Sequence, residues 1–208
     1  MLRRQESAIV YWLDARLYLN ITNECSNNCW FCFRNYKEGV NGFNLKLPHE
    51  PETAEVIFAL EKSVPAKKWV EVVFCGFGEP TSRLNLLLEI AKWMKAHCPK
   101  LPIRLDTNGQ GYVINRGREV VKELKEAGVD RVSVSLNGHN KETYNENCRP
   151  KINDAFEAVL DFIAKAKTEL EVEVSAVRMP EVDIPKVKAI AEGLGVPFRV
   201  RDYIPCIW

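Results

Sequence analysis

The sequence lacks a long hydrophobic run, a strong net charge and any repeated or low-complexity tract. No apolar stretch approaches the ~18–20 residues that a membrane-spanning helix needs, so we expect no membrane span. The 29 basic and 28 acidic residues leave a formal net charge of +1, whereas a dedicated nucleic-acid binder carries a large basic excess. Hydrophobic residues make up 46% of the chain, which excludes disorder as its main state.

A secretory signal is also missing from the first residues. Two arginines precede an apolar stretch, but Asp14 and Arg16 interrupt that stretch, and no small-residue cleavage site follows it. We therefore expect a cytoplasmic protein. The length of 208 residues predicts a single domain that covers residues 1–208.

Strand-like and helix-like segments alternate along the chain. Six strand-like runs begin at Arg16, Trp69, Pro102, Arg131, Leu170 and Pro197. Helical periodicity falls between them, over residues 52–64, 84–98, 118–128, 153–167 and 184–195. This alternation predicts an α/β fold with parallel strands and right-handed crossovers.

The number of strand–helix units limits the architecture. A complete eightfold barrel needs about 250 residues, so the six βα units of residues 16–203 predict a partial (βα)6 TIM-like barrel. A doubly wound sheet is the alternative. The apolar run of residues 8–13 predicts a short β-hairpin with the first strand, within an N-terminal segment that covers residues 1–15.

Several strands alternate apolar and polar residues, although strands buried on both faces are continuously apolar. The apolar faces must meet the helices, so the polar faces predict a barrel interior that is wet or holds a polar ligand. A sandwich with one solvated face is the alternative, and the helical crossovers disfavour it. Three arginines on polar faces are candidates for binding an anionic group: Arg104, Arg199 and Arg201. Their alternative role is internal pairing with Glu71, Asp106 or Glu173, because buried charge requires a partner.

Three of the seven cysteines lie within eight residues, directly after the first strand, as Cys25, Cys29 and Cys32. Barrel enzymes place their chemistry at this end of the strands, and clustered cysteines in a cytosolic chain indicate metal or redox chemistry. Three thiolates on one loop suit an iron–sulfur cluster, and they leave one iron of a 4Fe–4S cluster open to a non-protein ligand. The alternatives are a zinc site completed by His49 or Cys75, and three unrelated buried cysteines.

The CxxxCxxC spacing, with the aromatic Phe31 before its last cysteine, resembles the signature of the radical S-adenosylmethionine (SAM) superfamily. The resemblance implies that a 4Fe–4S cluster binds SAM and cleaves it reductively to methionine and a 5′-deoxyadenosyl radical, which abstracts hydrogen from a substrate. It also implies a reducing electron donor of the flavodoxin or ferredoxin type. Phe31 is then expected to pack on the adenine of SAM.

Further segments agree with this resemblance. The sequence CGFGEP at residues 75–80 follows the second strand and is similar to the family segment whose backbone binds the amino group of SAM. By that similarity Gly76, Gly78 and Glu79 are expected to contact the cofactor. Other expected cofactor contacts end the next three strands: Thr107, Asn108, Ser135, Asn137 and Arg178. For each of these five the alternative is a helix cap, a turn or a solvated charge.

A closer resemblance is to a small family of radical SAM proteins associated with TatD-type nucleases. It rests on segments spread over residues 17–203: LYLNITNECSNNCWFCFRN, VFCGFGEPT, IRLDTNG, VSVSLN and FRVRDY. Asp106 and Phe77 depart from that family, where Asn and Tyr are expected. The resemblance implies a functional link to a TatD-type nuclease, and it does not identify the reaction.

The leading hypothesis is a radical SAM enzyme that acts on an unidentified polar substrate. The alternatives are an activase or modifier of a protein or RNA partner, an enzyme similar to 7-carboxy-7-deazaguanine synthase, and a non-catalytic metal-stabilised module that serves a nuclease. A six-unit barrel predicts a wide lateral opening, which suits a substrate borne on a macromolecule unless residues 1–15 or the C-terminal IPCIW close it.

The remaining cysteines form no CxxC pair, which argues against a second cluster. Cys98 falls in a helix and is expected in the core. Cys75 and Cys148 are the candidates for thiols near the site, and no role is predicted for Cys206.

Overall fold

The computed structural model describes residues 8–203 and contains one seven-stranded sheet, with the strand order β1-β2-β5-β6-β7-β8-β9. The strands are β1 (Val10–Leu13), β2 (Arg16–Leu19), β5 (Glu71–Phe74), β6 (Ile103–Thr107), β7 (Arg131–Ser135), β8 (Glu171–Arg178) and β9 (Phe198–Asp202). All neighbouring pairs from β2 to β9 are parallel. The expected α/β fold, a partial TIM-like barrel of six parallel strands, is confirmed.

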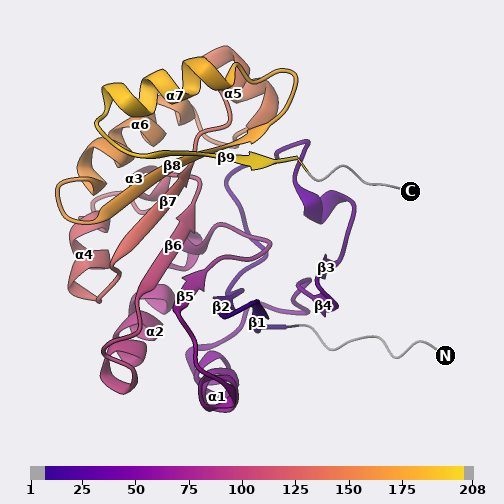
Figure 1. The fold of residues 1–208 in the computed structure, drawn as a ribbon, viewed down its shortest axis with the longest axis vertical. Helices are drawn as coiled ribbons and strands as arrows, with labels where there is room; N and C mark the ends of the chain where they lie inside the picture. Colours follow the sequence, from indigo (N-terminus) through magenta and orange to yellow (C-terminus); the bar gives the residue numbers. More distant parts are fainter. Residues whose placement is uncertain (1–7, 204–208) are drawn as a thin grey trace.

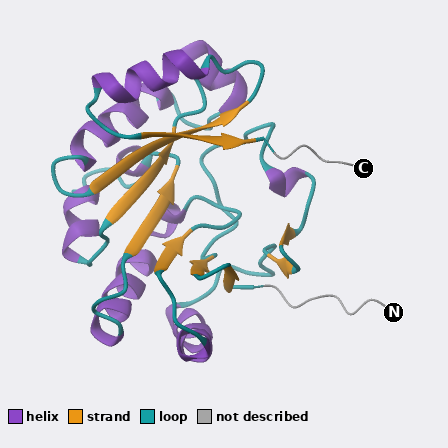
Figure 2. Cartoon of the chain, in the orientation of Figure 1, coloured by secondary structure: helices purple, strands orange, loops and turns teal. Residues whose placement is uncertain are grey.

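Helices cover the outer, convex side of this curved sheet, whereas loops face its inner side (Figures 1 and 2). The helices are α1 (Thr53–Ser63), α2 (Leu84–His97), α3 (Gly111–Ile114), α4 (Val120–Glu126), α5 (Lys141–Cys148), α6 (Ala155–Ala166) and α7 (Ile184–Gly193). Within residues 8–203, none of them is both long and apolar enough to cross a membrane. The five helices expected from periodicity are present, with ends that differ by a few residues.

Three features of the structure are not among the expected elements: the short helix α3, the helix α5 and a second hairpin. The sequence of α5, KETYNENC, is mostly polar and carries no apolar period, so its helix depends on the Asn140 cap, which accepts a hydrogen bond from the Thr143 backbone, and on tertiary contacts. A second hairpin, β3 (Gly39–Val40) with β4 (Phe43–Asn44), lies in the long connection after β2. Its strands are two residues long, which is too short for a period-2 pattern to show.

The expected N-terminal hairpin is confirmed by the antiparallel pairing of β1 with β2, which places Leu13 opposite Arg16. Its turn puts Asp14 in the left-handed region at φ 52°, a conformation that Asp tolerates better than most residues. This hairpin adds a seventh strand to the edge of the barrel. Residues 1–7 of the expected N-terminal segment lie outside the described residues.

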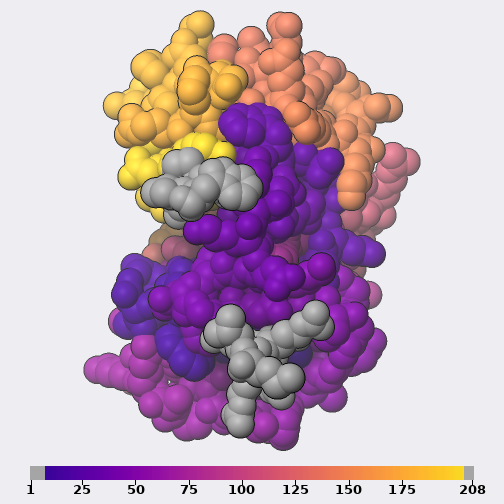
Figure 3. Space-filling view, turned by 90° about the vertical axis from the view of Figure 1, so that its right-hand side faces the viewer, coloured from indigo at the N-terminus to yellow at the C-terminus, as the bar shows by residue number. Residues whose placement is uncertain are grey.

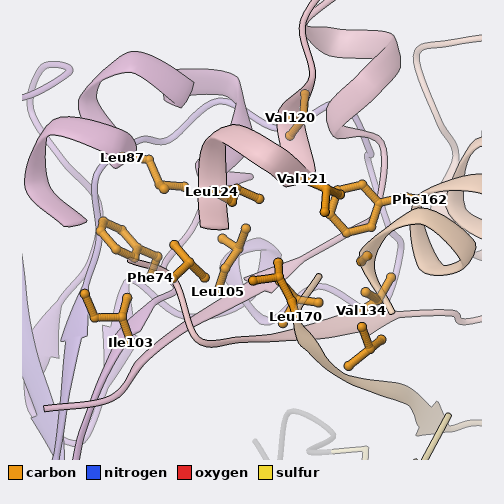
Figure 4. Packing of buried hydrophobic residues seen from close by; sticks show 14 of the residues in the cluster. Phe74, Leu87, Ile103, Leu105, Val120, Val121, Leu124, Val134, Phe162 and Leu170 are labelled. Carbon is orange, nitrogen blue, oxygen red and sulfur yellow. The ribbon is translucent and has the colours of Figure 1, made fainter. Parts of the chain in front are cut away.

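The apolar faces of the strands pack under the helices, as the alternation predicts. Figure 4 shows Phe74, Leu105 and Val134 of three neighbouring strands against Leu87 and Phe162 of the covering helices, and all five are fully buried. The buried face of β2 continues this core with Leu17 and Leu19. The polar faces of the same strands therefore point to the inner side of the sheet.

The sheet does not close into a complete barrel among the described residues, because β1 and β9 are its two edges. The connection after β2 runs along the inner, open side (Figure 1) and forms much of the surface in the indigo-to-purple region of Figure 3. Its Trp30 ring packs edge-on against Tyr203, with 5.9 Å between ring centroids. The predicted opening is thus partly covered by this connection, and residues 10–13 extend the sheet instead of covering it. The IPCIW segment lies outside the described residues.

Candidate active site

The cysteine loop, residues 20–32, begins where β2 ends and reaches the short 3₁₀ helix η1 (Phe33–Asn35). It lies at the carboxyl end of the parallel strands, the end at which barrel enzymes carry their chemistry. Cys25, Cys29 and Cys32 are all half-buried on this loop and none of them forms a disulfide. The sequence motif is therefore placed at the rim of the barrel, where a ligand on the inner side can reach it.

The three thiols differ in their electrostatic surroundings. A hydrogen bond with the thiol of Cys148, helped by the charge of Arg34, lowers the pKa of Cys29. Burial, with the nearby Glu79 carboxylate, raises the pKa of Cys25 to about 11, and burial raises that of Cys32. Cys29 is thus the thiol with most thiolate character in the protein alone, and thiolate is the form that binds metals.

The end of α5 and the segment that follows it hold the cysteine loop in place. The backbone N–H of Asn28 donates to the carbonyl of Cys148 at 2.9 Å, and that of Lys151 donates to the carbonyl of Ser26 at 2.8 Å. The Trp30 indole N–H donates to the side chain of Asn147 at 3.1 Å. A loop without regular structure is therefore held from outside by a helix end more than a hundred residues later in the chain.

Arg34 holds the same loop from its other end. Its guanidinium donates to three backbone carbonyls, those of Asn23 at 3.3 Å, Asn27 at 3.3 Å and Phe77 at 3.2 Å. These bonds join the cysteine loop to the loop after β5 and place a positive charge beside the cysteines. Sequence reasoning missed Arg34, Asn147 and the contact of Cys148 with Cys29, because backbone carbonyls and distant helix ends leave no motif.

The donor set fits an iron–sulfur cluster better than a single metal ion. Within residues 8–203, no three His, Cys, Asp or Glu side chains converge closely enough to hold one ion. His49, one of the two residues that could complete the alternative zinc site, instead pairs with Glu55 at 2.9 Å. Three cysteines on one loop supply the thiolates that a cluster requires, and a four-iron cluster is wider than one ion, so its ligands lie farther apart.

The loop after β5 approaches the cysteine loop so closely that two glycines are required. An added Cβ at Gly76 would lie 2.0 Å from the Asn20 side chain, and one at Gly78 would lie 2.4 Å from the carbonyl oxygen of Glu24. The backbone N–H of Glu79 donates to the same Glu24 carbonyl at 2.7 Å. The glycines therefore have a packing role here, in addition to the cofactor contact expected of them.

Glu79 joins two of the other predicted residues. Its buried carboxylate accepts hydrogen bonds from the Thr107 hydroxyl and from the Asn108 backbone N–H, both at 2.7 Å, and from the hydroxyl of Thr81. Asn108 in turn donates to the hydroxyl of Ser26 in the cysteine loop at 2.8 Å. The structure thus brings Glu79, Thr107 and Asn108 together with the cysteines, and it engages their side chains with one another. Burial outweighs these bonds and raises the pKa of Glu79.

Of the remaining predicted cofactor contacts, Ser135 and Asn137 are placed differently from Arg178. Asn137 is buried and accepts from the Val177 backbone N–H at 2.8 Å, and Ser135 accepts from Arg201 at 3.1 Å. Arg178, at the end of β8, has a side chain that is 64% exposed and lies 3.5 Å from Asp202. Ser135 and Asn137 therefore belong to the inner side, whereas Arg178 lies at the rim. Phe31 is half-buried, with its ring edge-on to Trp30 at 5.8 Å.

The inner face of the sheet carries paired charges, as the internal-pairing alternative predicts. Arg104 lies 2.8 Å from Asp106 and 3.1 Å from Glu71. Arg199 lies 2.7 Å from Glu173. Burial raises the pKa of Asp106, although Arg104 and Arg201 oppose that shift.

The other cysteines that the sequence singled out occupy distinct positions. The thiol of Cys75 lies on the inner face beside Asp106, and burial raises its pKa. Cys148 is fully buried against Cys29. Cys98 follows the end of α2 and is half-buried, and Cys206 lies outside the described residues. Cys75 and Cys148 thus lie beside the groups of the candidate site.

Comparison with known proteins finds a matching family and several related sequences. The model of the Radical SAM superfamily matches residues 19–192. A probable GTP 3′,8-cyclase of Thermococcus kodakarensis is 35% identical over 150 residues, which are 72% of this chain and 43% of that protein. The GTP 3′,8-cyclase of Paenarthrobacter nicotinovorans is 28% identical over 190 residues, which are 90% of this chain and 50% of that protein. The chain spans about half the length of these relatives or less.

Solved structures share the fold. Streptococcus suis SuiB bound to S-adenosylmethionine superposes with a TM-score of 0.70 at 15% identity, over 94% of this chain and 42% of that one. A methylornithine synthase superposes with a TM-score of 0.61 at 18% identity, over 91% of this chain and 53% of that one. At such low identity the likeness concerns the arrangement of strands and helices.

Proposed function

Because this chain belongs to the radical SAM superfamily, whose members are enzymes that use a 4Fe–4S cluster and SAM, we propose that it abstracts hydrogen from a polar substrate. The observation that carries this proposal is the position of Cys25, Cys29 and Cys32 on one half-buried loop at the carboxyl end of the parallel strands. This is the end of the barrel at which a ligand on the polar inner face meets the cysteines.

Cys25, Cys29 and Cys32 would hold the cluster through their thiolates. When bound, the cluster supplies the electron that splits SAM into methionine and a 5′-deoxyadenosyl radical. The hydrogen bond with Cys148 and then the charge of Arg34 lower the pKa of Cys29, which favours the thiolate that binds iron. The hydrogen bonds of the cysteine loop to the end of α5 and to the segment after it would hold the thiolates in a fixed direction.

We assign SAM to the space between the cysteine loop and the inner ends of the strands. The backbone of residues 76–79 would receive its methionine end, and Phe31 would pack on its adenine. Thr107 and Asn108 support this loop through Glu79, and Ser135, Asn137 and Arg178 are the proposed polar contacts on the next strands. The side-chain oxygens of Glu79 and Thr107 already have hydrogen-bond partners. These two side chains would therefore act by positioning the backbone of the loops after β5 and β6.

The test is anaerobic reconstitution with iron and sulfide, followed by incubation with SAM and dithionite and quantification of 5′-deoxyadenosine by liquid chromatography. We expect a brown protein that forms 5′-deoxyadenosine. The matched control is Cys29→Ala, which removes one proposed ligand and should abolish both the colour and the product. Absence of the product from reconstituted wild-type protein, with and without host extract, would count against the proposal.

The substrate class is a separate part of the proposal. We propose a polar substrate, because the inner face carries polar and charged side chains such as Arg104, Ser135 and Arg201, where a barrel that only packs a core would be apolar. The relatives named GTP 3′,8-cyclase act, by their names, on an anionic nucleotide. Since this chain spans about half their length or less, we do not assign GTP as its substrate.

A second candidate is a substrate borne on a macromolecule. It is favoured by the edges β1 and β9, which leave the sheet unclosed among residues 8–203. The fold neighbour SuiB has also been solved bound to a precursor peptide. Incubation of the enzyme, SAM and reductant with size-fractionated host extract distinguishes the two candidates: substrate-dependent 5′-deoxyadenosine should follow the high-mass fraction for a macromolecule and the low-mass fraction for a small molecule.

The cellular setting completes the proposal. A flavodoxin or ferredoxin type of protein would supply the electron, and a reducing cytoplasm would keep the free thiols reduced. The resemblance to the TatD-associated family adds a functional link with a TatD-type nuclease, which co-purification of the two proteins under anaerobic conditions would test.

A further inference from the structure

Arg201 is a half-buried arginine on β9 that lies within ion-pair distance of no carboxylate of residues 8–203. Its single described hydrogen bond runs from one terminal nitrogen to the Ser135 hydroxyl at 3.1 Å. Its Nε is buried and has no hydrogen-bond partner. Burial lowers the pKa of Arg201, which reflects the cost of keeping its charge away from water. A buried N–H donor without an acceptor is unfavourable, so this nitrogen is available to an anion that enters the inner side.

The neighbouring arginines on the inner face are already neutralised. Arg104 pairs with Glu71 and Asp106, Arg131 pairs with Glu71 and Glu171, and Arg199 pairs with Glu173. Asp106 is the carboxylate that acts most on Arg201, but Arg104 holds it at 2.8 Å. The charge of Arg201 is therefore the one left over on this face.

The position of Arg201 links the cysteine loop with the inner face. It lies on β9 opposite Val177 of β8, and its charge acts both on Cys29 of the loop and on Cys75 of the inner face. Strands β6, β7 and β8 separate β9 from β5, which leads into the glycine loop proposed to hold the methionine end of SAM. An anion at Arg201 would thus lie on the inner side of the sheet, near the cysteine loop and near Cys75, the residue before the glycine loop.

We propose that Arg201, oriented by its hydrogen bond to Ser135, forms a subsite for an oxyanion of the substrate, a carboxylate or a phosphate group. A guanidinium offers two parallel N–H donors that match such a group. The subsite rests on the proposed function, in that the anchored molecule is the one from which hydrogen is abstracted. The fold alone does not give the chemical class of the substrate, whereas this subsite predicts that the substrate carries an anionic group.

The test measures anion binding without reductant, on reconstituted protein carrying SAM, with inorganic phosphate and pyrophosphate as probes in isothermal titration calorimetry. We expect Arg201→Met to weaken pyrophosphate binding about tenfold or more, the loss expected for a charge-assisted bond to an ionised group. Arg199→Met is the matched control, because Arg199 lies on the same strand and face but is paired with Glu173. Its effect should stay within about threefold.

Thermal unfolding of the same proteins separates a binding role from a structural one. Arg201→Met should raise the melting temperature in the absence of anions, because it removes a half-buried charge that pairs with no carboxylate of residues 8–203. It should also abolish the rise that phosphate causes in the wild type. Arg201→Lys keeps the charge without the fork, so it should retain part of the phosphate response.

Three results would overturn the proposal: no phosphate response in the wild type, an equal loss of pyrophosphate binding in Arg199→Met, or a melting temperature lowered by Arg201→Met. A tenfold loss of SAM affinity in Arg201→Met would also overturn it, since the anion would then be the SAM carboxylate. Formation of 5′-deoxyadenosine is measured separately, so failure of the subsite and failure of the proposed function give different results.

Discussion

The carboxylate of Glu79 accepts a 2.7 Å hydrogen bond from the hydroxyl of Thr107, which lies 28 residues later in the chain. The bond joins the loop after β5 to the end of β6, and the second oxygen of the same carboxylate holds the backbone of Asn108. Asn108 then reaches Ser26 beside Cys25. One buried carboxylate thus sets the spacing between three loops of the candidate site, which explains why predicted cofactor residues are engaged with one another.

Gly78→Ala should destabilise the protein by about 1–3 kcal/mol, the usual cost of forcing an extra carbon into a packed site. The new Cβ would meet two backbone carbonyl oxygens, those of Glu24 and Thr22, at 2.4 and 2.6 Å, and backbone cannot rotate aside. Urea unfolding measures the change. The control is Gly193→Ala at the end of α7, where a Cβ meets nothing within 4 Å, and where we expect a gain of about 0.5–1 kcal/mol.

Alanine substitution of Cys25, Cys29 or Cys32 should remove most of the iron and sulfide that reconstituted protein retains, since each thiolate is a proposed ligand. Metal analysis and the visible absorption spectrum provide the measurement. Cys98→Ala is the matched control, because Cys98 lies at the end of α2, outside the cysteine loop. Full iron and sulfide content in all three loop variants would contradict the assignment.

Asp106→Asn should remove part of the pH dependence of stability. Burial raises the pKa of Asp106 in the folded protein above its unfolded value of about 3.9, so the folded state holds this proton more tightly. The resulting stability is present below about pH 4 and is lost as the pH rises through the folded pKa. The free energy of unfolding of the wild type, relative to Asp106→Asn, should therefore fall as the pH rises above about 4.

Asp183→Asn is the control for this experiment, because its shift has the opposite sign. Hydrogen bonds from the backbone and side chain of Lys186 lower the pKa of Asp183 at the start of α7. Its contribution is present above the unfolded pKa and is lost as the pH falls. Relative to Asp183→Asn, the wild type should thus gain stability with rising pH. If the stability difference from wild type changed with pH in the same way for Asp106→Asn and Asp183→Asn, the shift assigned to Asp106 would be contradicted.

Arg178→Ala should weaken SAM binding about 10- to 100-fold if its rim guanidinium holds the SAM carboxylate, given about 1.5–3 kcal/mol for such a bond. Its exposed contact with Asp202 adds little to stability, so folding should be preserved. Equilibrium dialysis with labelled SAM measures the affinity. Lys188→Ala, which removes an exposed charge on α7, is the control, and unchanged affinity in Arg178→Ala would remove this residue from the site.

The sequence by itself determined the strands, most of the helices and the place of the cysteine loop. Alternation of polar and apolar residues is a local property, and burial of the apolar faces under helices follows from it directly, as Leu17 and Leu105 show. The spacing of Cys25, Cys29 and Cys32 is equally local, because three ligands on one loop need no distant residue. The polar helix α5 escaped this reasoning, since its stability comes from a cap and from tertiary contacts.

Only the tertiary structure decided which side chains meet. Cys148 touches Cys29 because the end of α5 packs on the cysteine loop, and Arg34 finds its three carbonyls on two separate loops. The charges of the inner face could be predicted to pair, but their partners depend on strand register and on the direction in which long side chains lean. Arg201 leans toward Ser135, 66 residues earlier in the chain, and so remains without a carboxylate among the described residues. A local pattern contains no information about such distances, because they are set by how strands far apart in the chain come to lie next to one another.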